Sequence, residues 1–356
     1  MDKLEQARQE INGIDREMAA LFERRMRAAE DVIAYKTEHG LPVLDSGRER
    51  AVLEQNAANI HNPAYLEYYT DFLQGVMELS KRYQRVLAFA DAVAYQGVEG
   101  AYSHITLKRL FPGARAVSFE TFEEVIRAVE SGEIPCGVLP FENSYTGEVG
   151  TILDLLYRYD VKISRIYDLK ISHNLLGLKG ARLSDIRQVY SHEQGLSQCK
   201  RFLDSCRVEQ ISYLNTALAA KFVSESGDRS KAAIASIETA ALYGLEVLAP
   251  DISTSAENTT RFIVISREMG GEGNRFSLLF TLDHDAGRLA GVMQIIARYG
   301  FNMDNIKSKS LHNLPWQYYF YVEIEGNLFS PEAQTMIGEM KCECKELKVL
   351  GSYRKE

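Results

Sequence analysis

Residues 137–150 read GVLPFENSYTGEVG, a stretch that predicts a strand, a polar loop and the start of a helix. The first three residues indicate a short buried strand, and Pro140 is expected to end it because proline has no N–H to donate. Asn143 and Ser144 then place small hydrogen-bonding groups beyond the strand. Ligands of open α/β sheets bind at the carboxyl ends of strands, so the loop is either a ligand site or a polar turn that caps the next helix.

The composition is that of an ordinary soluble globular protein. The chain has 356 residues, which suggests two or three domains at roughly 150 residues each. Its net charge of −8 argues against a nucleic-acid partner. The first residues are charged, and no apolar run approaches the length of a membrane span, so we expect a cytoplasmic protein. The five cysteines lack zinc-site spacing, which predicts reduced thiols and no metal.

The first ninety residues repeat apolar side chains at alternating steps of three and four, as in a helical seam. The repeat consists of Leu4, Ala7, Ile11, Ile14, Met18, Leu21, Ala28, Val32 and Tyr35. Arg25 interrupts it, where a cation either meets an anion or extends its head to solvent. Lys36 follows eleven residues later, about 20° around the same helix, so two cations share one face.

A third basic residue, Arg8, is too far away to serve the same small ligand within one chain. It lies about 42 Å from Lys36 on a straight helix, so it can contribute only across a dimer. Two more helices are expected, one beginning near residue 45 and one over about 64–87. Their polar candidates are Arg48 and Glu49 on the first helix and Ser80 and Gln84 on the second. A helical bundle with a buried polar site explains this distribution.

This segment, about residues 3–88, resembles the all-helical chorismate mutases. The match consists of Arg8-x-x-Ile11-x-x-x-Asp15, Arg24-Arg25, Lys36, Pro42-Val43-x-Asp45-x-x-Arg48-Glu49-Arg50 and Ser80-x-x-x-Gln84. The resemblance implies an intertwined dimer. It assigns the substrate carboxylates to Arg25, Arg48 and Arg8 of the partner subunit, the ether oxygen to Lys36 and Gln84, and the ring hydroxyl to Glu49 and the backbone around Asp45, with Ser80 nearby. Rearranging chorismate to prephenate needs positioning and charge stabilisation but no nucleophile.

After residue 91 the pattern changes to alternating strands and helices. The plan of strand, polar turn and helix occurs at residues 93–111 and again at 189–196 and 232–238. A late strand returns within residues 252–266, behind a cluster of hydroxyl side chains, while residues 162–178 are long enough to cross between lobes. Two α/β lobes around a cleft are therefore expected. His192 is interpreted as a capping or packing residue rather than a general base, because no paired carboxylate is evident.

The middle segment, about residues 92–268, resembles prephenate dehydratase, whose two lobes are similar to periplasmic binding proteins. The match consists of Gln96-Gly97-x-x-Gly100-Ala101-Tyr102-Ser103, Pro140-x-Glu142-Asn143-Ser144-x-x-Gly147, Ser191-His192-x-Gln194-x-x-x-Gln198-Cys199 and Asn258-x-Thr260-Arg261-Phe262. The resemblance implies that Thr260 is catalytic, donating to the leaving hydroxide, and that Arg261 and Phe262 of the same motif bind the substrate. Asn143, Ser144 and Ser103 would bind the carboxylates or the keto group. The alternative for Thr260 is a strand-start hydroxyl that bonds the backbone.

The last segment predicts a ferredoxin-like βαββαβ order. Trp316, Tyr318, Phe320 and Val322 alternate on one face and are interpreted as core. The segment resembles the ACT domain of the P-proteins of phenylalanine synthesis, through Pro315-Trp316-x-Tyr318-x-Phe320-Tyr321 and Lys348-Val349-Leu350-Gly351. In that family phenylalanine binds between two such domains, which points to Gly287, Leu289 and Ser308 as allosteric residues. The effector motifs depart here, reading Gly287-Arg288-Leu289-Ala290 and Lys307-Ser308-Lys309-Ser310, with a lysine where the family has glutamate.

Together these segments predict a bifunctional enzyme of three domains. They are an all-α chorismate mutase bundle (1–90), a two-lobed α/β dehydratase (91–268) and an α+β ferredoxin-like ACT domain (275–356). The expected substrates are chorismate and prephenate, with phenylalanine as effector, a homodimer as the assembly, and neither a metal nor an organic cofactor. Two alternatives stay open: a small-molecule sensor with inactive sites, and a dehydratase that prefers arogenate.

Overall fold

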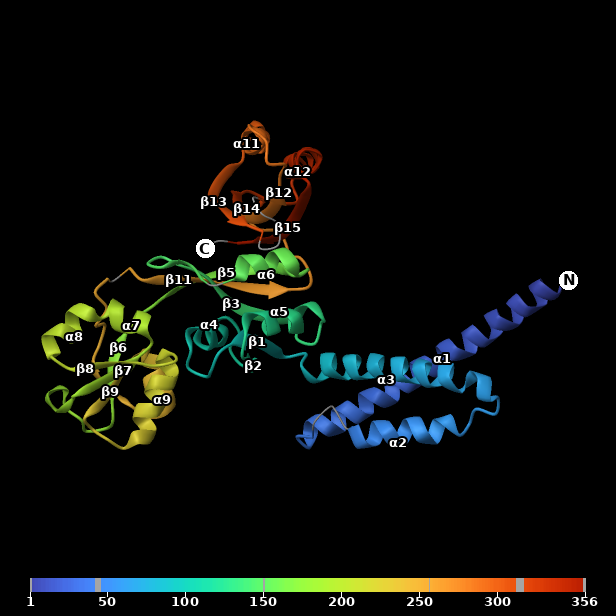
Figure 1. Cartoon of the computed structure of the whole chain (residues 1–356), viewed down its shortest axis with the longest axis horizontal. Coiled ribbons are helices and arrows are strands. Elements are labelled where there is room, and N and C mark those ends of the chain that lie inside the picture. Colours follow the sequence, from blue (N-terminus) through green and yellow to red (C-terminus); the bar gives the residue numbers. More distant parts are fainter. Residues whose placement is uncertain (1, 42–45, 150, 256, 312–316, 355–356) are drawn as a thin grey trace. The chain divides into compact units, whose positions relative to one another are not determined.

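A computed structural model of the chain describes residues 2–41, 46–149, 151–255, 257–311 and 317–354. The elements gather into two compact units, Met1–Ala90 and Asp91–Glu356 (Figure 1). No helix within the described residues is long and apolar enough to cross a membrane.

The first unit is helical, as predicted. Its elements are α1 (Lys3–Glu38), α2 (Ser46–Ala57), the 3-10 turn η1 (Pro63–Tyr65) and α3 (Leu66–Ala88). The third helix begins at Leu66 because Pro63 starts a separate turn, in which the Asn62 side chain accepts a hydrogen bond from the Ala64 N–H at 3.0 Å. Helix α3 contacts both α1 and α2, so it joins the other two helices of the unit.

The predicted apolar seam of α1 is largely exposed in the single chain. Leu4, Ile11 and Leu21 are 56%, 55% and 61% exposed. The residues that α1 buries are Ala29 and Ile33, in its C-terminal half. The seam is therefore not an internal one, since the described residues of one chain do not cover it.

The second unit begins with a mixed sheet in the order β2-β1-β3-β11-β5, with β4 beside β3. Its strands are β1 (Ala92–Gln96), β2 (Arg115–Phe119), β3 (Cys136–Asn143), β4 (Gly147–Glu148), β5 (Lys162–Lys170) and β11 (Thr259–Ser266). Its helices are α4 (Tyr102–Leu110), α5 (Phe122–Glu130) and α6 (Ile152–Arg158). β1 is parallel to β2 and β3, whereas β11 is antiparallel to β3 and β5.

The second lobe is inserted between β5 and β11. Its sheet has the order β10-β6-β9-β7-β8. The strands are β6 (Asn174–Gly177), β7 (Gln188–Ser191), β8 (Glu209–Ser212), β9 (Lys231–Ala235) and β10 (Glu246–Ala249), and the helical elements are η2 (Leu183–Asp185), α7 (Glu193–Gln198), α8 (Lys200–Cys206), α9 (Thr216–Ser226) and α10 (Ile237–Tyr243). Residues 162–178 cross between the lobes as predicted, because β5 belongs to the first sheet and β6 to the second.

Strand β3 continues through Pro140 to Asn143, so the prediction that Pro140 ends the strand is wrong. The pairing of β3 with β11 shifts register at Phe141, which has no paired residue. Such a bulge interrupts the ladder locally and accommodates a residue that lacks an N–H. Asn143 is consequently the last residue of β3, paired with Thr260, instead of lying in the following loop.

The C-terminal module, defined as residues 275–353, has the predicted βαββαβ order. Its sheet has the order β13-β14-β12-β15. The elements are β12 (Arg275–Thr281), α11 (Arg288–Arg298), β13 (Asn302–Ser310), β14 (Tyr318–Glu325), α12 (Pro331–Glu343) and β15 (Glu346–Tyr353). Of the predicted core residues, Val322 is buried and Phe320 packs beside it, Tyr318 is half-exposed, and Trp316 lies outside the described residues.

The opposite face of this sheet is also buried, which the sequence analysis did not predict. Tyr319 and Tyr321 are 1% and 0% exposed. The Tyr321 ring lies 5.4 Å from the Phe141 ring, measured between centroids, and the Tyr319 hydroxyl donates to Asp154 of α6 at 2.7 Å. The module therefore packs directly against the first lobe.

We expect Phe262→Ala to destabilise the second unit, because the Phe262 ring is 1% exposed in the core of the first lobe. Truncating a buried phenylalanine typically lowers the free energy of unfolding by about 3–5 kcal/mol. Urea denaturation would measure the change. Phe329→Ala, at a ring that is 47% exposed, is the control and should shift the free energy by only about 0.5 kcal/mol. Equal stability of the two variants would contradict the core assignment of Phe262.

Candidate active sites

The first candidate site lies in the helical unit, where α1 and α3 bring a cation and a hydroxyl together. Arg25 Nη1 donates to the Ser80 hydroxyl and lies 3.3 Å from the Val76 carbonyl oxygen. Ser80 is buried, and its hydroxyl donates to the Val76 carbonyl at 2.9 Å. Burial lowers the pKa of Arg25. The structure thus brings Arg25 of α1 and Ser80 of α3 together.

Three further predicted residues of this unit are half-buried: Lys36 on α1, Glu49 on α2 and Gln84 on α3. Glu49 accepts a hydrogen bond from Lys81 Nζ at 3.2 Å. Lys81 also pairs with Glu78 at 2.8 Å, one turn earlier on α3. Lys81 is a neighbour of the site that the sequence analysis missed.

The remaining predicted residues of the helical unit are more peripheral. Arg8 is exposed on the N-terminal half of α1, about 42 Å along the helix from Lys36. Its predicted role therefore requires a second copy of the chain. Arg48 on α2 is exposed, and Asp45 lies outside the described residues.

The second candidate site is a cavity of about 220 Å³ in the second unit. Residues from both lobes line it, namely Ala101, Tyr102, Asn143, Ile171, His173, His192, Gln194, Gly195, Gln198, Asn215, Thr216, Asn258 and Thr260. None of these lining residues carries an acidic, lysine or arginine side chain. His192 caps α7, since its Nδ1 accepts the Gln194 N–H at 3.2 Å, as expected. The site thus presents hydrogen-bond donors and acceptors without a carboxylate, ammonium or guanidinium group.

Asn143 holds the Thr260 hydroxyl in place. Its Nδ2 donates to Thr260 Oγ1 at 2.9 Å and to Asn258 Oδ1 at 2.8 Å. Its Oδ1 accepts the backbone N–H groups of Tyr145 and Thr146 at 2.9 and 3.0 Å, which fixes the orientation of the amide. Because Thr260 Oγ1 accepts this bond, its own O–H proton remains available for donation to a ligand.

A second chain of hydrogen bonds supports this pair. Asn258 Nδ2 donates to Gln198 Oε1 at 3.1 Å, and the same oxygen lies 2.7 Å from His173 Nε2. His173 Nε2 is therefore the protonated nitrogen, and its Nδ1 accepts from the Tyr102 hydroxyl at 3.2 Å. Burial lowers the pKa of His173 and raises that of Tyr102. Both side chains are accordingly neutral at pH 7.

Three predicted binding residues of this region do not line the cavity. Ser103 is buried on α4. The Ser144 hydroxyl donates to the Glu257 carbonyl and accepts the Thr259 N–H, each at 3.0 Å, so it joins the end of β3 to the start of β11. Phe262 belongs to the core of the first lobe. Packing and backbone hydrogen bonds occupy these three side chains in this structure.

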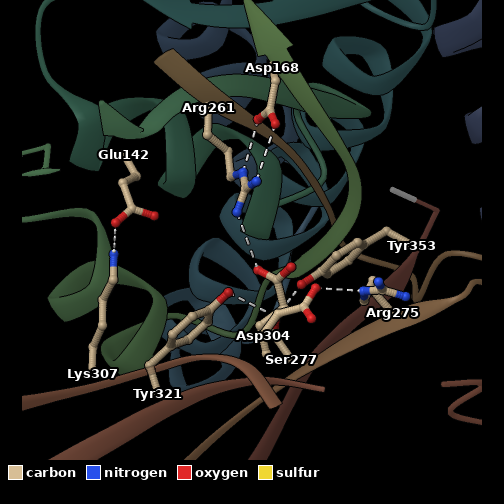
Figure 2. A network of polar contacts seen from close by, with 10 residues as sticks. Glu142, Asp168, Arg261, Arg275, Ser277, Asp304, Lys307, Tyr321 and Tyr353 are labelled. Carbon is tan, nitrogen blue, oxygen red and sulfur yellow. Dashed lines mark hydrogen bonds and ion pairs between the residues drawn. The ribbon is translucent and has the colours of Figure 1, made fainter. Parts of the chain in front are cut away.

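Arg261 also lies away from the cavity, in an ion-pair network on the opposite side of β11 (Figure 2). Its Nε lies 2.9 Å from Asp168 Oδ1, and its Nη1 lies 3.7 Å from Glu323 Oε2 of the C-terminal module. The hydrogen bonds to Asp168 raise the pKa of Arg261. Alternation along the strand explains the placement, since adjacent residues point to opposite faces and Thr260 faces the cavity.

The C-terminal module contains a smaller cavity of about 160 Å³, and one predicted allosteric residue, Leu289, lines it. The other two do not. Gly287 caps the N-terminus of α11 with a φ of 87°, and Ser308 is exposed on β13. Lys307 pairs instead with Glu142 of the first lobe, with 2.8 Å between Nζ and Oε1.

A larger cavity of about 720 Å³ lies beside α5 and α6 and reaches Tyr319 of the module. It contains none of the predicted site residues. Its buried carboxylate, Asp154, accepts from Tyr319 and pairs with Lys309 at 2.8 Å. The predicted dehydratase residues therefore point to the cavity of about 220 Å³ that contains Thr260.

Comparisons with known proteins match both units of the chain. The family model for prephenate dehydratase matches residues 93–270, and that for chorismate mutase type II matches residues 7–85. The bifunctional chorismate mutase/prephenate dehydratase of Buchnera aphidicola subsp. Schizaphis graminum is 30% identical, over 98% of this chain and 96% of its own length. This chain belongs to the bifunctional chorismate mutase/prephenate dehydratase family.

Two further relatives match part of this chain. Arogenate dehydratase 2 of Petunia hybrida is 34% identical, over 73% of this chain and 71% of its own length. The crystal structure of prephenate dehydratase from Arthrobacter aurescens in complex with L-Phe covers 74% of this chain and 90% of its own, with a TM-score of 0.68 and 24% identity. The latter similarity shows a shared fold.

The sequence analysis missed much of the support around Thr260. It quoted Tyr102, Gln198 and Asn258 within motifs but assigned them no role, and it did not single out His173. The available signal for His173 was its position where residues 162–178 cross between the lobes. A residue at such a crossing adjoins the cleft, which is why His173 reaches the cavity.

We expect the second unit to lose stability in mild acid because His173 is buried. Its folded-state pKa lies below the ordinary 6.5, so below about pH 6.5 the unfolded chain binds a proton that the folded chain does not. The free energy of unfolding therefore decreases as the pH falls from about 6.5 toward the lowered pKa. Urea denaturation at several pH values would measure this decrease, and His173→Gln should reduce its slope by up to about 1.4 kcal/mol per pH unit. An unchanged slope in that variant would contradict the role of His173.

Proposed function

We propose that the chain catalyses two successive reactions of phenylalanine biosynthesis. The helical unit rearranges chorismate to prephenate, and the two-lobed region converts prephenate to phenylpyruvate. The observation that carries this proposal is the Thr260 hydroxyl, held by Asn143 at 2.9 Å inside a polar cavity, within the motif that resembles the dehydratases. The proposed domains are 1–90, 91–268 and 275–356.

The mutase reaction breaks a C–O ether bond while a C–C bond forms in the same molecule, so the site needs cations and hydrogen-bond donors rather than a nucleophile. Lys36 and Gln84 are proposed to stabilise negative charge that develops on the ether oxygen. The remaining proposed contacts are Arg25, Arg48 and Arg8 of the partner subunit on the carboxylates, and Glu49, Asp45 and Ser80 at the ring hydroxyl. The contact between Arg25 and Ser80 supports this arrangement.

A homodimer is part of the proposal. The apolar stripe along α1 is exposed in one chain, and Arg8 lies about 42 Å from the Lys36 of its own chain. An antiparallel second copy would cover the stripe and bring its Arg8 to the end of the helix that carries Lys36. One interface would then bury the apolar stripe and place Arg8 of one chain near Lys36 of the other.

In the dehydratase reaction a C–C bond to the leaving carboxylate breaks, its electrons enter the ring, and the ring C–O bond breaks with loss of hydroxide. Formation of the aromatic ring drives the step, so modest assistance suffices. Thr260 is proposed to donate its O–H to the departing oxygen, while Asn143 holds Thr260 Oγ1 from behind. Asn143, Ser144 and Ser103 were predicted to contact the substrate, and of these Asn143 is the one that lines the cavity.

We further propose that the C-terminal module is an ACT-type regulatory domain with phenylalanine as its effector. The βαββαβ fold and the small cavity at Leu289 support this assignment. The relative from Arthrobacter aurescens crystallised with L-Phe. Inhibition of prephenate dehydration by added phenylalanine would support the effector, and an unchanged rate would overturn it.

The test of the overall proposal is a time course of the purified protein with chorismate alone, following prephenate and phenylpyruvate together. Transient prephenate followed by phenylpyruvate would establish both activities. Prephenate that accumulates would leave a mutase, with arogenate as the next substrate for the second unit, as the Petunia relative suggests. Untouched chorismate would overturn the mutase assignment.

We expect Thr260→Ala to reduce prephenate dehydration by about 100-fold or more, the usual contribution of a positioned proton donor. Steady-state rates with prephenate would measure the loss. Thr260→Ser retains the hydroxyl and should keep much more activity than Thr260→Ala. Wild-type dehydration by the alanine variant would refute the catalytic role.

We expect Lys36→Ala to reduce chorismate rearrangement by about 100-fold or more, because it removes a cation from the developing charge. The helical content should be unchanged, since Lys36 is half-buried at the end of α1. Chorismate consumption and circular dichroism would measure these properties. Lys3→Ala at the opposite end of the helix is the control. Normal turnover by folded Lys36→Ala would remove Lys36 from the site.

A further inference from the structure

Strands β3 and β11 carry candidate site residues on one face and charged residues on the other. Across the two strands, Asn143 pairs with Thr260 and Glu142 pairs with Arg261. Side chains alternate along a strand, so Glu142 and Arg261 point away from the cavity when their neighbours face it. Figure 2 shows that both charged residues face the C-terminal module.

Lys307 of β13 meets the first of these charges. Its Nζ lies 2.8 Å from Glu142 Oε1, and the two side chains are 18% and 29% exposed. The same ammonium group lies 5.3 Å from the centre of the Phe141 ring. A pair this sheltered from water is less screened than a surface pair, and removing one partner leaves a partly desolvated charge.

Arg261 joins the second strand to the same module. Two of its nitrogens bond Asp168 of β5 at 2.9 and 3.2 Å, and a third lies 3.7 Å from Glu323, which is fully buried on β14. Each catalytic strand is therefore connected to the module through the residue next to its cavity residue.

The module's sheet is cross-linked by buried hydrogen bonds close to these contacts. Near Glu323, the buried Ser277 hydroxyl hydrogen-bonds the Tyr321 hydroxyl at 2.9 Å and also the Tyr353 hydroxyl (Figure 2). These three residues come from three neighbouring strands of the module's sheet. The charged partners of β3 and β11 thus project from a hydrogen-bonded sheet rather than from a loop.

We propose that Lys307 and Glu323 are positioning residues for the dehydratase reaction, acting through Glu142 and Arg261 to keep Asn143 and Thr260 aligned across β3 and β11. This inference rests on the proposed function of the second unit. In this proposal Lys307 holds β3 in position through Glu142, and it stands where the ACT family has a glutamate.

A positioning role predicts a loss in kcat rather than in substrate binding. Small displacements of the Thr260 donor weaken a contact that matters most in the transition state, whereas the neutral groups that line the cavity stay in place. Residues that couple two regions without touching the substrate typically change the measured coupling by about 2- to 30-fold.

The experiment compares Lys307→Met with wild type in the full-length chain. The kcat and KM for prephenate are measured, together with the chorismate rearrangement rate of the same preparations as an internal reference. Lys345→Met is the matched control, because Lys345 forms an ion pair of 2.8 Å with Asp283 in the same module at an exposed position. Lys307→Arg, Glu142→Gln and the double variant Lys307→Met/Glu142→Gln complete the set.

We expect Lys307→Met to lower the dehydratase kcat about tenfold with KM within about twofold, and to leave the rearrangement rate unchanged. Lys307→Arg should restore most of the loss, and the double variant should be no worse than the worse single variant, because both changes remove one contact. A kcat for Lys307→Met equal to that of Lys345→Met, or fully additive losses in the double variant, would overturn the inference. A wild-type chain that rearranges chorismate but never dehydrates prephenate would overturn the proposed function as well.

Discussion

The antiparallel pairing of β3 with β11 is the interaction on which the second unit depends. It brings Thr260 to Asn143 although 117 positions separate them in the chain. It also places β11 between β3 and β5, so that a strand contributed after the second lobe completes the sheet of the first. The polar cavity lies on one side of this pairing, and the C-terminal module packs on the other.

The two sides of these strands differ in charge. The cavity lining carries no acidic, lysine or arginine side chain, and burial lowers the pKa of His173 and raises that of Tyr102. The ionic groups Glu142 and Arg261 stand on the reverse side, where oppositely charged residues of the module meet them. The arrangement keeps strong fixed charges one residue away from the Thr260 hydroxyl, so that hydrogen bonds rather than ion pairs determine its orientation.

Local sequence patterns were sufficient for the order of elements. The helical repeat of the first ninety residues, the βα units and the βαββαβ ending all follow from periodicity and turn residues, whereas Thr260 and Asn143 were proposed from the resemblance to the dehydratases. The failures concern pairing between distant segments. Pro140 was predicted to end the strand because the bulge that accommodates it depends on β11. Arg261 was predicted to bind the substrate because periodicity does not show its ion pairs with Asp168 of β5 and Glu323 of β14. The seam of α1 was recognised, but periodicity does not reveal whether its partner is the same chain or another.

The insertion of the second lobe has a consequence for the order in which the protein can fold during synthesis. Residues 174–249 form a continuous segment that contains every strand of the second sheet, so this lobe can complete itself as it emerges from the ribosome. The first sheet cannot, because β11 fills the gap between β3 and β5 and is synthesised after the whole insert. Until it arrives, β3 and β5 each present an open edge to the surroundings. The lobe encoded second is thus the one that can fold first, whereas the sheet of the earlier lobe is complete only after β11 has been synthesised.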